Sequence, residues 1–418
     1  MKILFVTYKY YPKPGANAVC VQEIAKTFIA EGHTVNVLAY QDDSLGRKEK
    51  LTESYIVDGV KVYTIKPDLR MRLFYYADAN GDMVQARVAR QYASAISKIK
   101  QLLYMPLYPL YSIGFPLRLA NKIASLQNEH FYDVIVGTFS PFDTIPALLK
   151  VKKIYSNIRM YVLAFDSFIN QRRKFVPEQY RSADFWVRKA LDKLDGIIYM
   201  KSRAAEFSRY QKNASKLFVA DIPLLTLNQI EMSQINMTHD KNVGDWVYAG
   251  TLGLPHYDVT HLIWTFLEIS KRSNIVLHFY SSGSGLNKIR ELEKMTHGKI
   301  KAHDYVEHKK LIEIYKMADV LVSVKSSNQI SAKIFEYMTY GKPIVHFSEI
   351  EEDPDYRYVE AYSKGIVIKT WETPKEEWPL QLEKALANLN AVSEMPVMDM
   401  NKFIMNRPEY IRDILLDN

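Results

Sequence analysis

The chain has 418 residues, 48% of them hydrophobic and 24% charged, and a formal net charge of +8. This length allows two domains with separate cores, and the composition excludes a largely disordered chain. The single cysteine, Cys20, excludes an internal disulfide and a cysteine-based metal site, and it favours a cytoplasmic location. The first apolar run is too short for a signal peptide, and no run of about eighteen apolar residues predicts a membrane span. The positive charge favours an anionic partner: a phosphorylated small molecule, an anionic membrane surface or nucleic acid.

The chain opens with a pattern typical of a βαβ unit. An apolar strand over residues 2–6 is followed by a loop to Gly15, a helix over about 17–31 and a strand over 34–39. Such units build parallel sheets, whose ligands bind beyond the carboxyl ends of the strands. We therefore expect the loop before Gly15 to lie at a site, where glycine lets the backbone approach a ligand. The alternative is a plain turn glycine.

Residues 66–125 differ in character from their surroundings. They hold nine basic residues against three acidic ones, interleaved with large apolar side chains. Val84, Val88, Ala95, Ile99 and Leu102 recur at helical spacing. This pattern suits a basic amphipathic element that binds an anionic membrane surface. The alternative is an inserted helical hairpin that covers the domain core, with its charges simply solvated.

Alternating β and α patterns continue through the first half, so residues 1–222 predict one doubly wound, Rossmann-like domain. Ser140 follows the strand over 133–138, and Asp166 follows the strand over 160–164. Residues 223–244 lose the periodicity and predict a linker. A second doubly wound domain is expected over 245–397, and a last helix over about 401–416. Two such domains predict a central cleft between their strand ends, where a substrate bridges them.

The stretch 326–347 carries the strongest local signal. Asn328 and Ser331 are good N-cap residues, the helix then reaches Gly341, and a short buried strand follows. Lys333 in the first turn opposes the helix dipole unless an anion lies in front of the helix. Glu336, one turn later, is placed for a second polar part of the same ligand, as in a ribose diphosphate. The alternative is an ordinary αβ unit with a solvated Lys and Glu.

Further glycine loops are expected around this stretch, at Gly250 and Gly283. His256, beyond the Gly250 loop, is a candidate that reaches the cleft. Histidine and cysteine residues do not cluster at the spacing of metal ligands, so no metal is expected. The second domain shows no basic stripe interleaved with base-stacking aromatic residues, so nucleic acid is not an expected partner.

Several of these segments together resemble one known family. SAKIFEYMTYGKPIV resembles the donor-binding segment of nucleotide-sugar glycosyltransferases of the GT-B fold, group 1 or family 4 type. MKILFVTYKYYPKPGA with IAKTFIAEGHTVNVLAY resembles their first βαβ unit. LDGIIYMKS, VYAGTLG and KMADVLVSV follow in the expected order. The resemblance spans most of the chain, and the Phe-Glu-Tyr-Met…Gly-Lys-Pro segment is its most specific part.

The resemblance implies roles for individual residues. Glu336 would accept hydrogen bonds from the ribose of the donor, and the helix start at Ser331 to Lys333 would face the diphosphate. The loops at Gly15, Gly250 and Gly283 would approach the donor, with Ser140 and Asp166 on the acceptor side. The C-terminal segment 398–418 would return to the first domain. Such enzymes usually retain anomeric configuration without a metal, because positive groups and helix dipoles stabilise the leaving diphosphate.

Two positions depart from the family pattern. Relatives commonly carry an acidic residue where this chain has Asn328, and an Arg where it has Thr251, which leaves His256, Lys325 and Lys333 as substitute cations. We assign His256, Asn328 and Lys333 as catalytic candidates, and Thr251 to donor binding. The sequence thus predicts a glycosyltransferase that acts on a lipid-linked saccharide in surface or capsular polysaccharide synthesis, at the inner face of the membrane. The alternatives are a catalytically inactive GT-B partner subunit and, less favoured, a sugar-nucleotide epimerase.

Overall fold

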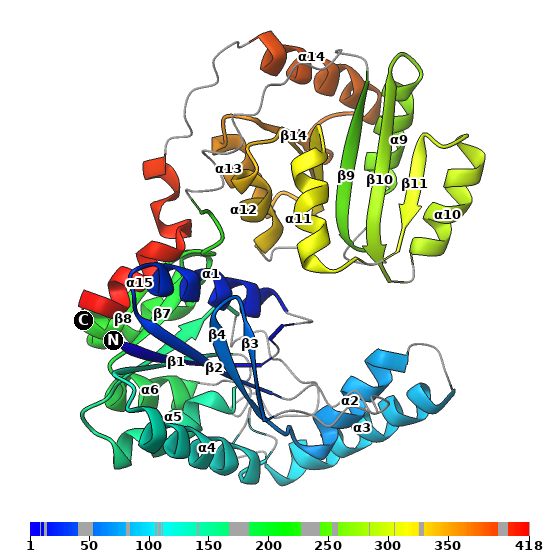
Figure 1. The fold of residues 1–418 in the computed structure, drawn as a ribbon. Helices are drawn as coiled ribbons and strands as arrows, with labels where there is room; N and C mark the ends of the chain where they lie inside the picture. Colours follow the sequence, from blue (N-terminus) through cyan, green and yellow to red (C-terminus); the bar gives the residue numbers. More distant parts are fainter. Residues whose placement is uncertain are drawn as a thin grey trace. The chain divides into compact units, whose positions relative to one another are not determined.

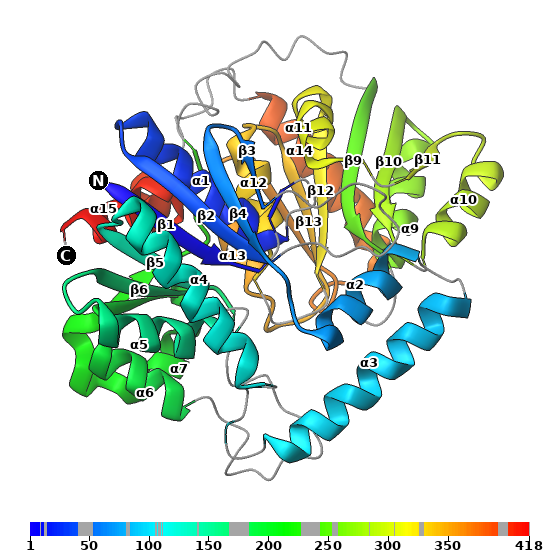
Figure 2. The ribbon, with the colours of Figure 1, turned by 60° about the horizontal axis from the view of Figure 1, so that its bottom comes forward.

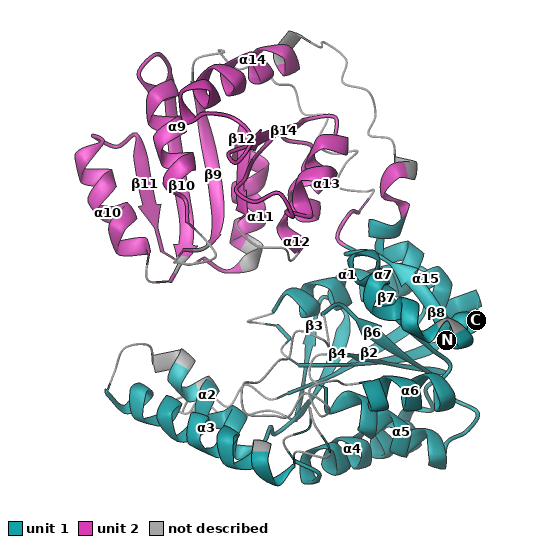
Figure 3. Ribbon diagram, turned by 180° about the vertical axis from the view of Figure 1, so that it is seen from behind, with its two compact units in different colours: residues 1–223, 405–418 teal, residues 224–404 magenta. Residues whose placement is uncertain are grey.

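The structure, a computed structural model, describes residues 1–8, 10–11, 15–40, 53–80, 84–104, 107, 110, 112–139, 142–166, 184–226, 243–252, 258–283, 285–304, 306–325, 330–391 and 400–417. The chain divides into two compact units (Figure 3). Unit 1 comprises residues 1–223 and 405–418, and unit 2 comprises residues 224–404. Each unit contains its own sheet and hydrophobic core.

Unit 1 is built on an eight-stranded sheet of order β3-β4-β2-β1-β5-β6-β7-β8. Its strands are β1 (Lys2–Thr7), β2 (Thr34–Tyr40), β3 (Ser54–Val57), β4 (Val60–Ile65), β5 (Val134–Thr138), β6 (Arg159–Ala164), β7 (Gly196–Met200) and β8 (Leu217–Ala220). All neighbouring pairs are parallel except β3 with β4. The central strands are buried almost throughout, because helices cover both faces of the sheet.

The helices of unit 1 flank this sheet (Figure 1). They are α1 (Ala16–Ala30), α4 (Gly114–His130), α5 (Thr144–Ile154), α6 (Asp184–Lys193), α7 (Ala204–Phe207) and α15 (Pro408–Asp417), with 3₁₀ segments at Lys201–Arg203 and Ser208–Lys216. Helices α1 and α15 lie on one face of the sheet, and α4, α5 and α6 lie on the other. The Rossmann-like pattern expected for the first half is thereby confirmed.

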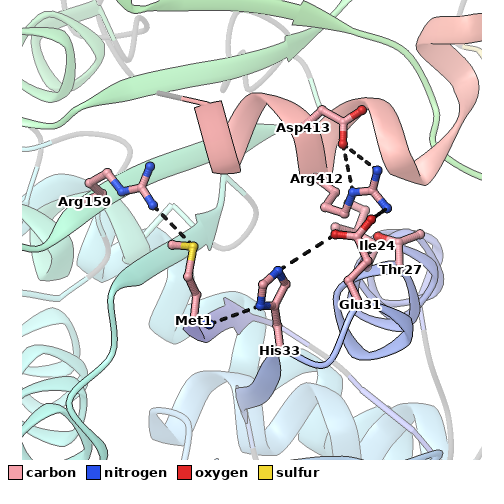
Figure 4. Close-up of polar contacts among 8 residues, drawn as sticks. All are labelled: Met1, Ile24, Thr27, Glu31, His33, Arg159, Arg412 and Asp413. Carbon is pink, nitrogen blue, oxygen red and sulfur yellow. Dashed lines mark hydrogen bonds and ion pairs between the residues drawn. The ribbon is translucent and has the colours of Figure 1, made fainter.

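The C-terminal helix α15 packs on α1 through charged as well as apolar contacts (Figure 4). Arg412 pairs with Glu31 at the end of α1 and also with its neighbour Asp413. Arg159 on β6 donates to the carbonyl of Leu416, 3.2 Å away. The last segment is not the single helix expected from the sequence, because a 3₁₀ helix (Met400–Asn406) precedes Pro408, which begins α15.

Helices α2 (Leu69–Asn80) and α3 (Val84–Leu103) form a hairpin that extends from unit 1 (Figure 2). Ala86 and Ala89 of α3 are buried against Ala77, Leu73 and Tyr76 of α2. The opposite side of α3 carries exposed apolar residues: Val84, Val88, Tyr92, Ile99, Leu102 and Leu103. The small residues of the hairpin therefore pack inward and the large apolar residues of α3 face outward. Both interpretations of residues 66–125 stay predictions. No helix among the described residues is long and apolar enough to cross a membrane.

Unit 2 contains a six-stranded, wholly parallel sheet of order β11-β10-β9-β12-β13-β14. The strands are β9 (Val243–Thr251), β10 (Asn274–Ser282), β11 (Ile300–His303), β12 (Val320–Lys325), β13 (Ile344–Ser348) and β14 (Gly365–Lys369). The helices are α9 (Thr260–Ser270), α10 (Leu286–Met295), α11 (His308–Met317), α12 (Ala332–Thr339), α13 (Asp355–Ala361) and α14 (Trp378–Ala391), with a 3₁₀ turn at Lys375–Glu377. The second doubly wound sheet expected from the sequence is thereby confirmed.

Five helices and strands of the described structure had no counterpart in the sequence prediction. These are β3, β11, α10, α13 and α14. The strand β3 pairs antiparallel with β4 through the turn at Asp58 and Gly59, both of which have positive φ angles. Its burial is only partial, so it lacks the continuous apolar run that marks the parallel strands.

Candidate functional site

The strand order defines one switch point in each sheet. In unit 2, successive connections run from β9 to β10 and β11 in one direction and through β12, β13 and β14 in the other. In unit 1, the corresponding reversal lies between β1 and β5. Ligands of open α/β sheets bind beyond the carboxyl ends of the strands at such a point. The candidate site of unit 2 therefore lies where β9 and β12 end.

The strands β9 and β12 separate before they end. Their pairing stops at Val322 with Tyr248, although β9 continues to Thr251 and β12 to Lys325. Beyond this point, side chains of α12 take the place of a strand partner. The N–H of Ala249 donates to the Tyr337 hydroxyl at 3.3 Å, and Lys333 Nζ donates to the Ala249 carbonyl at 2.6 Å. Two side chains of α12, the helix predicted to bind the donor, thus form hydrogen bonds with the end of β9.

Gly250 is required by the path of the Lys333 side chain. A Cβ added at Gly250 would lie 2.3 Å from Lys333 Nζ and 3.4 Å from the Tyr248 hydroxyl. Any side chain at this position would therefore displace the ammonium group. The two residues were predicted separately, from a glycine loop and from a helix start, and the structure brings them together.

The ammonium group of Lys333 is carried by a half-buried side chain. Burial lowers its pKa from 10.5 to about 8, while nearby Glu336 raises it and Lys325 lowers it further. Glu336 lies one turn along α12, and its side chain is half-buried. A half-buried cation at a helix N-terminus is suited to an anionic ligand. Ser331 occupies the predicted N-cap position, but its side chain makes no capping hydrogen bond.

The loops after β9 and β10 lie side by side. Ser281 and Ser282 pair with Gly250 and Thr251, and Gly285 N–H donates to the Leu252 carbonyl at 3.3 Å. Gly283 has φ +104°, a backbone conformation that favours glycine. The predicted residues Gly250 and Gly283 therefore belong to one edge of the sheet, next to the switch point.

A chain of buried charged groups lies behind the start of α12. Asp355, fully buried at the start of α13, accepts a hydrogen bond from Ser331 N–H at 2.8 Å. Its other carboxylate oxygen lies 3.6 Å from Nζ of Lys325, the last residue of β12. Asp353 accepts from the Asp355 N–H at 2.8 Å and pairs with His346 at 2.7 Å. Burial raises the pKa of Asp355.

The matching edge of unit 1 is held together by weaker polar contacts. Gly15 precedes α1 with φ −88°, and a Cβ added there would meet no atom within 4 Å. Asn17, in the first turn of α1, donates to Asp166 at the end of β6 at 3.0 Å. The predicted residues Gly15 and Asp166 are therefore brought to one edge through Asn17.

Other predicted site residues lie outside the described part of the chain. These are Ser140, His256 and Asn328. Thr251 ends β9, and its side chain is also outside the description. Among the described residues, no group of three or more His, Cys, Asp or Glu side chains is placed to hold a metal ion.

A comparison with known protein families gives a match within unit 2. Residues 244–373 match the model for the family described as glycosyl transferases group 1. The match covers β9 to β14, including α12 and the buried charges behind it. A search of curated proteins found no match.

Solved structures extend the likeness to the whole chain. An α,α-trehalose-phosphate synthase (UDP-forming) from Burkholderia xenovorans is 12% identical, with a TM-score of 0.59 and 99% of each chain covered. The catalytic domain of starch synthase IV from Arabidopsis thaliana is 13% identical, with a TM-score of 0.56 over 100% of this chain and 99% of that one. WaaG, a glycosyltransferase involved in lipopolysaccharide biosynthesis, is 16% identical, with a TM-score of 0.50 and 100% of both chains covered. The chain therefore has the GT-B fold, and the predicted resemblance to this type of glycosyltransferase is confirmed.

Sequence reasoning missed the groups that support α12 from behind. Asp353 and Asp355 lie in the acidic run EEDPD, which is typical of a solvated loop. Both are buried, and Asp355 contacts a residue 24 positions earlier in the chain. A proline within an acidic run, directly before a helix, was the available signal, because Pro354 is the N-cap of α13.

Proposed function

We propose that the protein transfers a sugar from a nucleotide-sugar donor to a saccharide acceptor. The observation that carries this proposal is the junction of Gly250, Lys333 and the N-terminus of α12 at the switch point of unit 2. A half-buried cation, the positive end of a helix dipole and a glycine that lets the backbone approach closely suit a nucleoside diphosphate. Glu336, one turn further, is placed for the ribose hydroxyl groups. The group 1 family match supports the same assignment.

The chemistry proposed is transfer with retention, without a metal ion. Lys333 and the helix dipole stabilise the charge that develops on the departing diphosphate, as a preorganised electrostatic site does. His256, Asn328, Ser331 and Thr251 remain donor-side or catalytic candidates. On unit 1, Gly15 lies beside the pair Asn17 and Asp166, and Ser140 with Asp166 forms the proposed acceptor side.

The proposal is tested by transfer and hydrolysis assays with UDP-, GDP- and dTDP-sugars. Glu336→Ala and Lys333→Ala are expected to abolish most turnover, whereas Lys364→Ala is the matched control. Lys364 also donates to a backbone carbonyl, that of Gly341 at 2.6 Å, but away from the switch point. Turnover that is unchanged in both site variants would contradict the site.

The same assay separates transfer from the alternative of an inactive partner subunit. Asn328 and Thr251 stand where relatives carry charged residues, which is the specific reason to retain that alternative. Binding of a nucleoside diphosphate without turnover of any donor sugar would favour it. Conversion of the nucleotide-sugar into its epimer, without transfer to an acceptor, would favour the epimerase.

We also propose that the acceptor is lipid-linked and that the protein binds an anionic membrane surface from the cytoplasm, in surface or capsular polysaccharide synthesis. Helix α3 supports this proposal. It carries four basic residues and no acidic one, and its exposed apolar residues form one stripe. Arg87, Arg90 and Lys98 are offset to one side of this stripe on the helical wheel. An apolar stripe bordered by cations is typical of helices that lie in an anionic membrane interface.

The hairpin is joined at its base to the proposed acceptor edge. Lys100 pairs with Asp68 at 2.9 Å, and both act on Asp143, the residue before α5. Burial raises the pKa of Asp143 to about 7, as does Asp68, while Arg70 and Lys100 lower it. Asp143 follows β5, one of the two strands at the switch point of unit 1. If α3 binds a membrane, the base of its hairpin therefore lies next to the proposed acceptor side of unit 1.

Vesicle sedimentation tests the membrane proposal. Val88→Ser with Tyr92→Ser and Ile99→Ser, or charge reversal at Arg87, Arg90 and Lys98, is expected to release the protein from vesicles of phosphatidylglycerol. Reversal of three exposed lysines on other helices, Lys153, Lys193 and Lys294, is the control for total charge. Equal release by the control and the α3 reversals would attribute binding to net charge alone and contradict the proposal.

A further inference from the structure

The end of β12 places a second cation, and a buried one, beside the proposed donor site. Lys325 is the last residue of β12, only 7% exposed, and β12 is one of the two strands at the switch point. Its strand partner β13 continues the edge, because Glu349 N–H donates to the Lys325 carbonyl at 2.9 Å. Lys325 also acts electrostatically on Lys333, whose ammonium group is bound to the end of β9. The two cations therefore occupy both sides of the gap between β9 and β12.

A buried ion pair at this place is poorly explained by stability alone. The desolvation of a lysine and an aspartate offsets much of their attraction, so apolar residues of similar volume often stabilise a core as well or better. The ion pair of Lys325 and Asp355 also has a long separation, 3.6 Å. Buried ionisable groups with specific partners cluster at functional sites. The pair lies at the switch point rather than within either hydrophobic core.

Asp355 connects this cation to the start of α12. One oxygen accepts from Ser331 N–H, one residue before the helix, and the other faces Lys325. An acidic side chain bonded to the N-cap N–H fixes the helix start, as glutamate does in a capping box, here from a different helix. The N–H groups of the first turn are left directed along the helix axis. Asp353 in turn holds the Asp355 backbone and pairs with buried His346.

We propose that Lys325 is a second diphosphate-binding residue beside Lys333, and that Asp355 is the positioning residue that aligns Lys325 with the N-terminus of α12. This inference rests on the proposed function and identifies the cations of its donor site. It supplies the positive charge that relatives place in the loop after β9 and that Thr251 does not. These two ammonium groups are carried by β12 and α12 instead of by the loop after β9.

Calorimetric titration of the full-length protein with UDP, GDP and dTDP, and with the corresponding monophosphates, tests the inference. Lys325→Met is expected to weaken diphosphate binding by about tenfold or more, because a charge-assisted contact is lost. Monophosphate binding should change much less. Lys325→Arg keeps the charge and should restore most of the diphosphate affinity. A structural role alone would change both ligands equally.

Asp355→Asn separates the two roles of the carboxylate. The amide oxygen can still accept from Ser331 N–H, but Lys325 loses its counter-charge and either turns toward water or loses its proton. Diphosphate affinity should fall by roughly threefold to tenfold. The control is Asp195→Asn in unit 1, where Asp195 bonds Lys152 and Met160 N–H, both at 2.7 Å. That variant removes the same kind of contact and should leave nucleotide affinity unchanged.

The outcomes distinguish this inference from the proposed function. If no diphosphate binds the native protein, the proposed donor function fails and the inference fails with it. If the native protein binds a diphosphate and Lys325→Met binds it equally well, within about twofold, only the inference is overturned. Thermal unfolding of each variant identifies any loss of fold. If Lys325→Met does not fold, Asp355→Asn carries the test with Lys325→Arg as the charge-retaining control, and native diphosphate affinity in Asp355→Asn would equally overturn it.

Discussion

The carboxyl edges of the two sheets both contain a switch point, but different kinds of side chain join the elements there. In unit 2, Lys325 and Asp355 are buried, Lys333 is half-buried, and all three are bonded to backbone groups or to each other. In unit 1, the edge is joined by an exposed contact between Asn17 and Asp166. Burial makes each charge costly to leave unpaired, so the edge of unit 2 is suited to a strongly charged ligand. The edge of unit 1 is suited to a neutral one, such as the hydroxyl groups of a saccharide.

The largest effect is expected at Lys333. Lys333→Met removes the proposed charge-assisted hydrogen bond between the ammonium group and the diphosphate. Such a bond is worth roughly 1.5–3 kcal/mol, which corresponds to a loss of about tenfold to a hundredfold in diphosphate affinity. Titration calorimetry measures it, with Lys364→Met as the matched control in the same unit. If both variants lost equal affinity, the contrast between the switch point and the rest of unit 2 would not hold.

Gly250→Ala should have the next largest effect. The added Cβ would overlap Lys333 Nζ at 2.3 Å, so the ammonium group must leave the Ala249 carbonyl. Nucleotide affinity should fall by about tenfold, with a loss of unfolding free energy of roughly 1 kcal/mol. Gly15→Ala on the other edge meets open space and should leave the unfolding free energy unchanged. A Gly250→Ala protein with native affinity would contradict the packing described for Lys333.

The pH dependence of binding and of stability should have opposite signs at Lys333. Its pKa in the folded protein is about 8, below the ordinary 10.5, so the ammonium group is lost as pH rises through about 8. Donor affinity should therefore fall, by roughly tenfold from about pH 7 to about pH 9. Between about 8 and 10.5 the unfolded chain binds more protons, so this residue makes the ligand-free protein more stable as pH rises. Titrations and thermal unfolding compared with Lys333→Met isolate both contributions, and parallel pH profiles in the two proteins would contradict them.

The smallest effect is expected at the edge of unit 1. Asn17→Ala removes an exposed hydrogen bond to Asp166 and should cost less than about 1 kcal/mol of unfolding free energy. Nucleotide affinity should not change, whereas the KM for a saccharide acceptor should rise if Asp166 loses its orientation. Steady-state kinetics with each substrate varied separately measure this. A change confined to the donor KM would reverse the roles assigned to the two edges.

Much of the fold could be predicted from the sequence, because its parallel strands are continuous apolar runs that alternate with helices. The start of α12 and the strand β13 were predicted for the same reason, since Ser331, Gly341 and Pro343 mark their limits locally. The elements β3, β11, α10, α13 and α14 were missed. The strand β3 is only partly buried, so its sequence lacks a continuous apolar run. Its antiparallel pairing depends on a turn with positive φ angles, which hydrophobic periodicity does not reveal.

The candidate site could be predicted only where its residues are close in sequence. Lys333 and Glu336 share a helix, so their spacing reveals them. The contact of Lys333 with Ala249 joins residues 84 positions apart, and that of Asp355 with Ser331 joins residues 24 apart. No local pattern encodes either contact. The direction of α3 was equally hidden, because both its alanine face and its larger apolar face have helical spacing.

The chain enters and leaves unit 2 through neighbouring segments. Asp221 N–H donates to the Met405 carbonyl at 2.9 Å, and the Asn406 side chain donates to the Ile222 carbonyl at 3.4 Å. Unit 2 is therefore topologically an insertion into unit 1, which is completed only when α15 packs on α1. During synthesis, residues 224–404 emerge before the last helix of unit 1 exists. Unit 2 has all of its strands available for folding while unit 1 still lacks the helix that packs on α1.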